Sequence, residues 1–262
     1  MNRMGGISGG DMPMPSLVGN QYQKFELSLP FARTDINAFV KRIRGAAQLT
    51  KKIKPRGNGK IVTIEALREA LCTPAWDDLK KENSRITKLI KSSVFENENG
   101  EISVDYLLLF GFLNCPGEID DKSNVLYEIL QEGGPDTHKY LSAQDKDMVP
   151  TFNKLFKLAS SELVQLMKEV DGVEPTEVEG RAEDIDETLD EVREDNYLDP
   201  IYGFEARLDF KEWQERSRKP VTSKIFYEVN NLRNLIFTRA GISFPESNKF
   251  TNMCAENEIA TG

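Results

Sequence analysis

Two stretches of the chain decide its fold: Gly57-Asn-Gly-Lys-Ile-Val-Thr-Ile-Glu65 and Glu96-Asn-Glu-Asn-Gly-Glu-Ile-Ser-Val-Asp105. Each contains a glycine, one further residue and an isoleucine, and each leads into a stretch whose apolar residues recur with helical spacing. The two isoleucines, Ile61 and Ile102, lie 41 residues apart. The chain therefore contains a repeated unit in which a short extended run precedes a helix.

The repeat continues towards the C-terminus, where Leu141 and Leu208 lie in similar short runs. The expected strands cover residues 60–63, 101–104, 140–142 and 207–210. Apolar residues with helical spacing predict helices over residues 35–49, 77–92, 121–131, 147–170 and 222–237. Because the strands are too short for a substantial sheet, the sequence predicts a mainly α fold.

Glycine followed two residues later by an aliphatic residue, and then by a helix, resembles the second half of an EF-hand loop. In that loop glycine at position 6 makes the turn, and the aliphatic residue at position 8 contacts the partner loop. Placing Ile61 and Ile102 at position 8 puts Gly59 and Gly100 at position 6. The chain resembles the calmodulin superfamily, in particular the two-lobed calcineurin B-like and calaxin-like proteins, with degenerate calcium loops.

The resemblance implies two EF-hand-like lobes, each a pair of helix-loop-helix units with a short β-contact, plus an acidic insert and a C-terminal helix. The expected parts are a flexible N-terminal segment at 1–20, EF-hand-like pair 1 at 21–117, EF-hand-like pair 2 at 118–216 with an acidic insert at 171–198, and a C-terminal helix and tail at 217–262.

Composition excludes several classes of protein. The chain has 262 residues, a formal net charge of −9 and three widely spaced cysteines, which argue against a disulfide scaffold. Its longest nearly unbroken apolar run, residues 106–113, is far shorter than the about 20 residues that cross a bilayer. We therefore expect no membrane insertion, and a cytoplasmic location, with the cytoskeleton or a cilium as the setting that the resemblance suggests.

Charge is distributed unevenly along the chain. Residues 171–195 carry a net charge of −10, and residues 33–60 contain nine basic residues against Asp35 alone. The acidic block shows no sustained apolar periodicity, so we expect a mobile, solvated insert. The basic segment is expected to be either a solvated helix face or a charge-recognition patch, formed by Arg42, Arg44, Lys51, Lys52 and Lys54.

Calcium binding is expected to be weak or absent. In loop one, Lys54 and Arg56 fall at ligand positions 1 and 3, and in loop two Tyr106 falls at position 12, where Ca²⁺ needs a carboxylate. No cofactor is therefore expected, and only weak Ca²⁺ or Mg²⁺ binding is open to loops three and four. The weak metal candidates there are Asp136, Asp145, Glu205, Asp209 and Glu212.

Catalytic signatures are absent from the sequence. It contains no phosphate-binding G-x-x-x-x-G-K-[ST], no G-x-S-x-G and no H-E-x-x-H, and its only histidine is His138. We therefore do not expect an enzyme.

A ligand-poor EF-hand-like pair can still bind a partner protein through an amphipathic helix laid in an apolar groove. The sequence thus favours a non-catalytic adaptor or light-chain-like subunit of a larger assembly. The candidate partner-binding residues are Phe39, Leu107, Phe110, Phe112, Phe152, Phe156 and Met167. Phe110 and Phe112 lie two apart on a predicted helix, so one should be in the core and the other in the groove.

An alternative remains open at this stage. Asn-Gly, as in Asn58-Gly59 and Asn99-Gly100, is also the strongest signal for a two-residue hairpin. Helices followed by hairpins would suggest a winged-helix, nucleic-acid-binding module that uses the basic segment 33–60 to contact phosphates.

Overall fold

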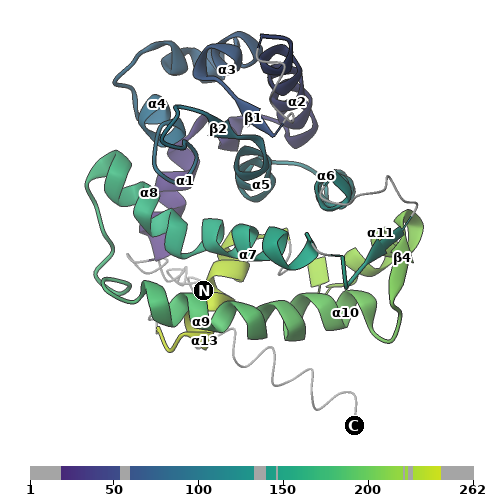
Figure 1. The fold of residues 1–262 in the computed structure, drawn as a ribbon. Helices are drawn as coiled ribbons and strands as arrows, with labels where there is room; N and C mark the ends of the chain where they lie inside the picture. The colour runs from purple at the N-terminus through teal and green to yellow at the C-terminus, as the bar shows by residue number, and fades with distance from the viewer. Residues whose placement is uncertain are drawn as a thin grey trace, which may run out of the picture.

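The computed structural model confirms a mainly helical fold (Figure 1). It describes residues 19–53, 60–132, 140–145, 147–220, 222–223 and 227–242. The expected flexible segment at 1–20 therefore lies outside the described residues, apart from the first two residues of helix α1.

The first half of the chain contains two helix-strand-helix units. Its elements are α1 (Gly19–Ser28), the 3₁₀ turn η1 (Pro30–Arg33), α2 (Ile36–Ile53), β1 (Ile61–Val62), α3 (Ile64–Ala70), the 3₁₀ turn η2 (Pro74–Lys80), α4 (Arg85–Ile90), β2 (Ile102–Ser103) and α5 (Val104–Asn114).

The second half repeats this order with additional helices. Its elements are α6 (Ile119–Glu132), β3 (Tyr140–Ser142), α7 (Met148–Ala159), α8 (Ser161–Asp171), α9 (Ala182–Arg193), the π-helical turn η3 (Glu194–Leu198), α10 (Asp199–Tyr202), β4 (Arg207–Asp209), α11 (Phe210–Ser217) and α13 (Val229–Arg239).

All four predicted strands are present, and they form two separate antiparallel pairs. β1 pairs with β2, and β3 pairs with β4, with Leu141 opposite Leu208. Both of these leucines are buried. Each half is thus tied together by a contact between extended runs that are far apart in the chain. A local antiparallel bridge also joins Glu96 to Ile102 across the turn at Asn99-Gly100.

The register of the first pair corrects one assignment. Val62, not Ile61, lies opposite Ile102, and Val62 is fully buried while Ile61 is only half-buried. The capping residue supports the same shift, because Thr63 directly follows Val62 just as Ser103 follows Ile102. The side-chain period of two in a strand means that this one-residue shift exchanges which face is buried.

Side-chain caps start the helices immediately after three of the strands. The hydroxyls of Thr63 and Ser103 accept hydrogen bonds from the backbone N–H groups of Ala66 and Tyr106, and so begin α3 and α5. Asp209 begins α11 in the same way. Each cap satisfies a backbone donor that would otherwise lack a partner at the start of the helix.

Aromatic side chains close the core of the first half. The ring of Phe31 contacts Phe39, Trp76 and Phe110, with centroid separations of 5.1, 4.9 and 4.9 Å. Gly111 allows α5 to approach α2, because a Cβ there would lie 2.2 Å from the Phe39 ring. These four rings therefore pack on one another within the first half.

The second half is built around α7, which packs against α5, α8, α9 and α13. The helix predicted over residues 147–170 is divided at Ser160, whose backbone leaves the helical region. The Ser160 hydroxyl donates to the Phe156 carbonyl at 2.6 Å, and so satisfies an acceptor at the end of α7.

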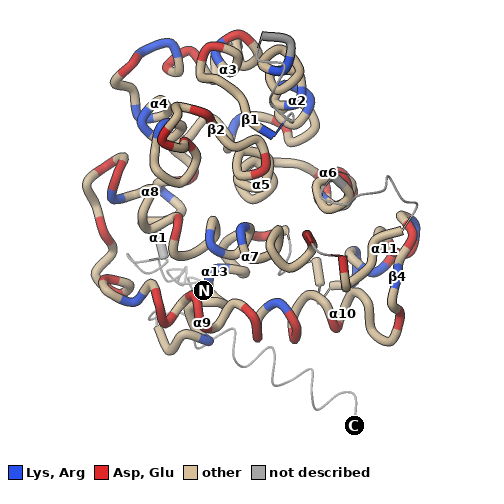
Figure 2. Tube along the Cα trace, in the orientation of Figure 1, with Lys and Arg blue, Asp and Glu red and all other residues tan. Residues whose placement is uncertain are grey.

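The expectation of a solvated insert at 171–198 is wrong. Most of this segment forms α9 and η3, and α9 buries Ile185, Leu189 and Val192 on one face. Figure 2 shows acidic residues along the outer side of this helix. Spacings of four and three residues between the buried positions make one helical stripe, which the surrounding acidic residues conceal in the sequence.

The buried hydrophobic residues of both halves form one continuous core. The boundary expected at 117–118 falls in the short connection between α5 and α6, and these two helices also contact each other directly. Among the described residues, no helix is both long enough and apolar enough to cross a membrane.

Candidate functional site

The acidic residues of loop four are engaged in folding contacts. Asp209 and Glu212 form a reciprocal capping box, in which each carboxylate accepts a 2.8 Å hydrogen bond from the other residue's backbone N–H. Glu205 forms an ion pair with Arg216 at 2.6 Å. These carboxylates hold the start of α11 and the turn before β4, and they do not converge on a common point.

In loop three, the Asp145 carboxylate accepts a 2.9 Å hydrogen bond from the Ser142 backbone N–H. Asp136 lies outside the described residues. Within the described ranges, no group of three or more His, Cys, Asp or Glu side chains is arranged to hold a metal ion.

The candidate partner-binding residues lie in the core. Each is at most 3% exposed: Phe39, Leu107, Phe110, Phe112, Phe152, Phe156 and Met167. The expectation that either Phe110 or Phe112 faces a groove is wrong, because α5 is covered on all sides. Phe110 packs against Phe31 and Phe95, and Phe112 packs against Tyr227 from the C-terminal region.

Two of the predicted basic-patch residues are tied to the fold. Arg42 donates to the Ala70 carbonyl at 3.0 Å, and Arg44 pairs with Glu128 on α6 at 2.6 Å. Lys51 is exposed at the end of α2. The Lys52 side chain and the whole of Lys54 lie outside the described part of the chain.

Helix α13 occupies an apolar seat formed mainly by α7 and α9, the elements with which it makes most of its contacts. Its buried face carries Leu232, Ile236 and Phe237. The Phe237 ring lies 5.8 Å from the ring of Tyr22 on α1, so the N-terminal helix completes the seat. The helix is largely enclosed, because only Thr238 and Arg239 of α13 are exposed. It is a helix of this chain, seated outside the groove that the sequence predicted for a partner helix.

A buried ion pair fixes the register of α13 in its seat. Arg233 is 3% exposed, pairs with Glu26 of α1 and also donates from Nε to the Ala159 carbonyl at 2.9 Å. Its guanidinium carbon lies 4.9 Å from the centroid of the Tyr22 ring. Burial raises the pKa of Glu26, although Arg233 partly opposes this. The pair therefore depends on both partners being present.

The acidic block contributes the second set of contacts to α13. Arg239 reaches Asp195 at 3.1 Å and Glu191 at 3.7 Å. In the opposite direction, Arg181 donates to the Ala240 carbonyl at 2.6 Å, just after the last turn of the helix. The positive charge of Arg181 interacts favourably with the dipole of α13 at its C-terminal end, and the same side chain supplies a hydrogen-bond donor to a terminal carbonyl. Acidic residues that resembled a solvated insert thus help to hold a basic helix.

The sequence contained a signal for this seat. The helix expected at 222–237 overlaps α13, but its apolar spacing does not show which surface it packs on. Arg233 and Arg239 on this helix are opposite in charge to the acidic block at 171–195, which has a net charge of −10. This complementarity indicates that the two segments pack together.

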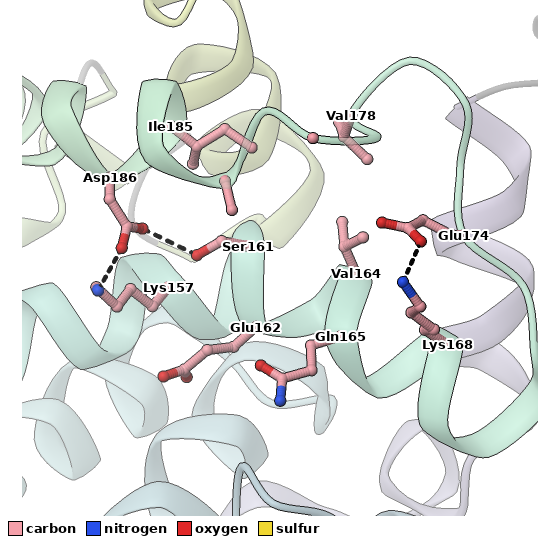
Figure 3. Close-up of a pocket in the computed structure, with 12 residues that line it drawn as sticks. Lys157, Ser161, Glu162, Val164, Gln165, Lys168, Glu174, Val178, Ile185 and Asp186 are labelled. Carbon is pink, nitrogen blue, oxygen red and sulfur yellow. Dashed lines mark hydrogen bonds and ion pairs between the residues drawn. The ribbon is translucent and has the colours of Figure 1, made fainter.

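A separate cavity of about 440 Å³ lies between α8 and the segment that leads into α9 (Figure 3). Val164, Val178 and Ile185 form its apolar wall. Two ion pairs cross it, Lys157–Asp186 and Lys168–Glu174, each at 2.5 Å. Their charged groups are therefore already paired within the chain.

Glu162 lies at the edge of this cavity, at the junction between the two halves. Figure 3 shows it directed to the side of α8 away from Val178. Its carboxylate accepts a 3.3 Å hydrogen bond from the hydroxyl of Tyr106 on α5, and its second oxygen is buried without a hydrogen-bond partner. Burial raises the pKa of Glu162 to about 7, although the Tyr106 hydrogen bond and Lys157 both act to lower it.

Comparison with known proteins yields no family model, no curated protein and no solved structure that matches this chain.

Proposed function

We propose that this protein is a non-catalytic, EF-hand-like adaptor, or light-chain-like subunit, that binds an amphipathic helix of a partner protein in the seat of α13. The observation that carries the proposal is that α13 is itself an amphipathic helix seated on an apolar surface and pinned by charged residues. The partner helix would exchange with α13, and the chain's own helix would cover the apolar seat when the partner is absent.

The contacts of α13 also indicate how such a partner would be selected. Burying an ion pair adds little net stability, since both charges lose water, but it strongly disfavours a helix that leaves one charge alone. A helix with apolar residues at the positions of Leu232 and Ile236 but without a cation at that of Arg233 would leave Glu26 unpaired. The seat would therefore favour basic amphipathic helices.

Little or no calcium dependence is part of the proposal. In loop four, the carboxylates of Asp209 and Glu212 accept backbone hydrogen bonds that start α11, so the chain's own N–H groups use acceptors that a metal ion would need. The cytoskeletal or ciliary setting stays a prediction from the resemblance.

Helix exchange can be tested with a labelled peptide of residues 227–242 added to the full chain. In the wild type, α13 is tethered at a high effective concentration, so it should exclude the peptide. Phe237→Ala should weaken the tethered helix by about 3–5 kcal/mol, a factor of 100 or more, and admit the wild-type peptide. Fluorescence anisotropy measures the uptake.

A peptide carrying Arg233→Glu is the matched control, because it retains the apolar face but places a carboxylate beside Glu26. It should bind the Phe237→Ala chain at least tenfold more weakly than the wild-type peptide. If circular dichroism shows the variant chain folded and neither peptide binds, the proposal is contradicted. Steeply salt-dependent binding of a DNA duplex by the wild type would instead favour the nucleic-acid alternative.

A further inference from the structure

A groove of about 540 Å³ lies between α2 of the first half and α6 of the second, and none of its lining residues belongs to the seat of α13. Val40 and Val125 line it from the two helices, together with Gly45. The volume lies within the range typical of small-molecule sites. Neither the helix-loop-helix framework nor the helix exchange proposed above requires it.

Gly45 keeps part of this groove open. It lies in the interior of an 18-residue helix, where glycine costs about 1 kcal/mol relative to alanine. A Cβ at this position would meet no atom within 4 Å, so no neighbouring side chain excludes a larger residue. Close packing against a neighbouring segment therefore does not explain the glycine, and its effect is to leave open space at the surface of α2.

Donor groups surround the open space. Lys41 is exposed and has no ion-pair partner among the described residues. The carboxamides of Asn37, Gln48 and Asn124 also line the groove. The Asn124 oxygen accepts a 2.7 Å hydrogen bond from Gln214, which leaves its NH₂ group to donate elsewhere.

Arg44 already binds an anion at this place. Its Nη1 meets the exposed carboxylate of Glu128 at 2.6 Å, across the groove from α2 to α6. An exposed pair of this kind contributes little to stability, so an incoming anion can replace it at low cost. Nε and Nη2 of Arg44 are buried, so Nη1 is the group that can reach a ligand. A phosphoryl group offers more oxygens than a carboxylate, and one of them can accept a charge-assisted hydrogen bond from Nη1.

We propose that the α2–α6 groove binds a small, hydroxyl-rich phosphate monoester such as a sugar phosphate. Arg44 and Lys41 would hold the phosphoryl oxygens, while the carboxamides would exchange hydrogen bonds with the hydroxyl groups. Gly45 would provide the room for the body of the ligand. The cavity of Figure 3 is a weaker candidate for such a ligand, because the charges that cross it are paired with each other.

Isothermal titration of the full chain with glucose 6-phosphate, inorganic phosphate and glucose tests this site. Glucose 6-phosphate should bind, inorganic phosphate should bind at least tenfold more weakly, and glucose should give no heat. Glu128→Gln should raise the affinity for glucose 6-phosphate about fivefold, because Arg44 loses the competing carboxylate.

Gly45→Leu is the decisive variant, since it fills the groove without removing any charge. It should abolish glucose 6-phosphate binding while its melting temperature stays equal to or above that of the wild type. Lys51→Gln, which removes a basic residue of α2 outside the groove, should leave binding within twofold. Absence of binding to both the wild type and Glu128→Gln would overturn the proposal. Equal binding by a folded Gly45→Leu protein would overturn it as well.

Discussion

The two halves of this molecule use the same β-contact, and both contain packed rings, as in the Phe156–Tyr197 contact of the second half, but only the second half holds α13. In the first half, rings from η1, α2, η2 and α5 pack directly on one another, as in the Phe31–Trp76 contact. In the second half, α7 is covered by α9 and α13, and charged residues on both helices hold them together. Under the proposed function, the first half is a permanent core and the second half contains a covered seat.

This difference bears on which part of the protein can open. Apolar side chains interlocked within a small set of helices must be released together. A helix that is held by its own buried side chains and a few ion pairs can leave as a local unfolding unit while the remainder stays folded. The second half is therefore where we expect exchange with a partner.

The largest expected effect comes from truncating an aromatic side chain in the first half. Phe110→Ala should lower the free energy of unfolding by about 3–5 kcal/mol, because it leaves a cavity between Phe31 and Phe95. Urea unfolding followed by circular dichroism measures this. Phe237→Ala should lower global stability less and should instead speed proteolysis within α13. If both variants lost the same free energy of unfolding and α13 stayed resistant to protease in Phe237→Ala, the distinction between the halves would be contradicted.

In the buried Arg233–Glu26 pair, the loss of one partner and the replacement of both should have different effects on stability. Arg233→Ala should weaken the docking of α13 by about 3–5 kcal/mol, because Glu26 is buried without a partner while the helix stays docked, and its global loss is limited as for Phe237→Ala. The double variant Arg233→Met with Glu26→Leu should be close to the wild type in stability. Thermal unfolding of both proteins checks this, and a double variant as unstable as Arg233→Ala would show that the pair itself stabilises the seat.

Glu162 should make the junction of the two halves sensitive to pH. Its pKa is about 7 in the folded protein, against 4.5 in the unfolded chain, so the folded state binds more protons between these values. Stability should therefore fall as the pH rises from about 4.5 to 7, by up to about 3 kcal/mol from this group. Tyr106, Lys154, Lys157 and Asp186 influence the same carboxyl.

Glu162→Gln tests this pH dependence. The variant should gain stability relative to the wild type as the pH increases through this window, and the gain should level off above pH 7. Urea titrations at pH 5, 6, 7 and 8 provide the comparison. A constant difference across that range would mean that Glu162 titrates normally in the folded protein.

The helix caps should produce the smallest effects. Asp209→Ala removes a reciprocal capping box and should cost about 1–2 kcal/mol. Ser103→Ala removes a single, longer bond of 3.4 Å and should cost about 0.5 kcal/mol. Thermal unfolding measures both, and a larger loss for Ser103→Ala would reverse the ranking of the two caps.

Local patterns predicted the strands because short-range chemistry determines them. Leu141 and Leu208 pair as expected, since apolar residues between turn residues and helix starts have few other conformations open to them. The first pair was predicted one residue out of register, because Ile61 and Val62 are both aliphatic. The neighbouring cap, Thr63, carried the information that distinguishes them.

Burial and docking were harder to predict, because they depend on which distant segment covers a surface. Phe112 is spaced like a groove residue, and only the fold brings Tyr227 against it. Ile185 and Leu189 form an apolar stripe, but the acidic residues around them make the average composition of the segment strongly polar. The seat of α13 required opposite charges far apart in the sequence to be matched, which periodicity within one segment cannot do.

Hydrogen–deuterium exchange of the full chain tests the central claim most directly. If α13 is an exchangeable helix in a covered seat, its amides should exchange through an opening at least 2 kcal/mol smaller, about thirtyfold faster, than those of α5. Glu26→Gln should accelerate exchange in α13 and leave α5 unchanged. Equal protection of α13 and α5, unaffected by Glu26→Gln, would show that α13 belongs to the permanent core and would contradict the account.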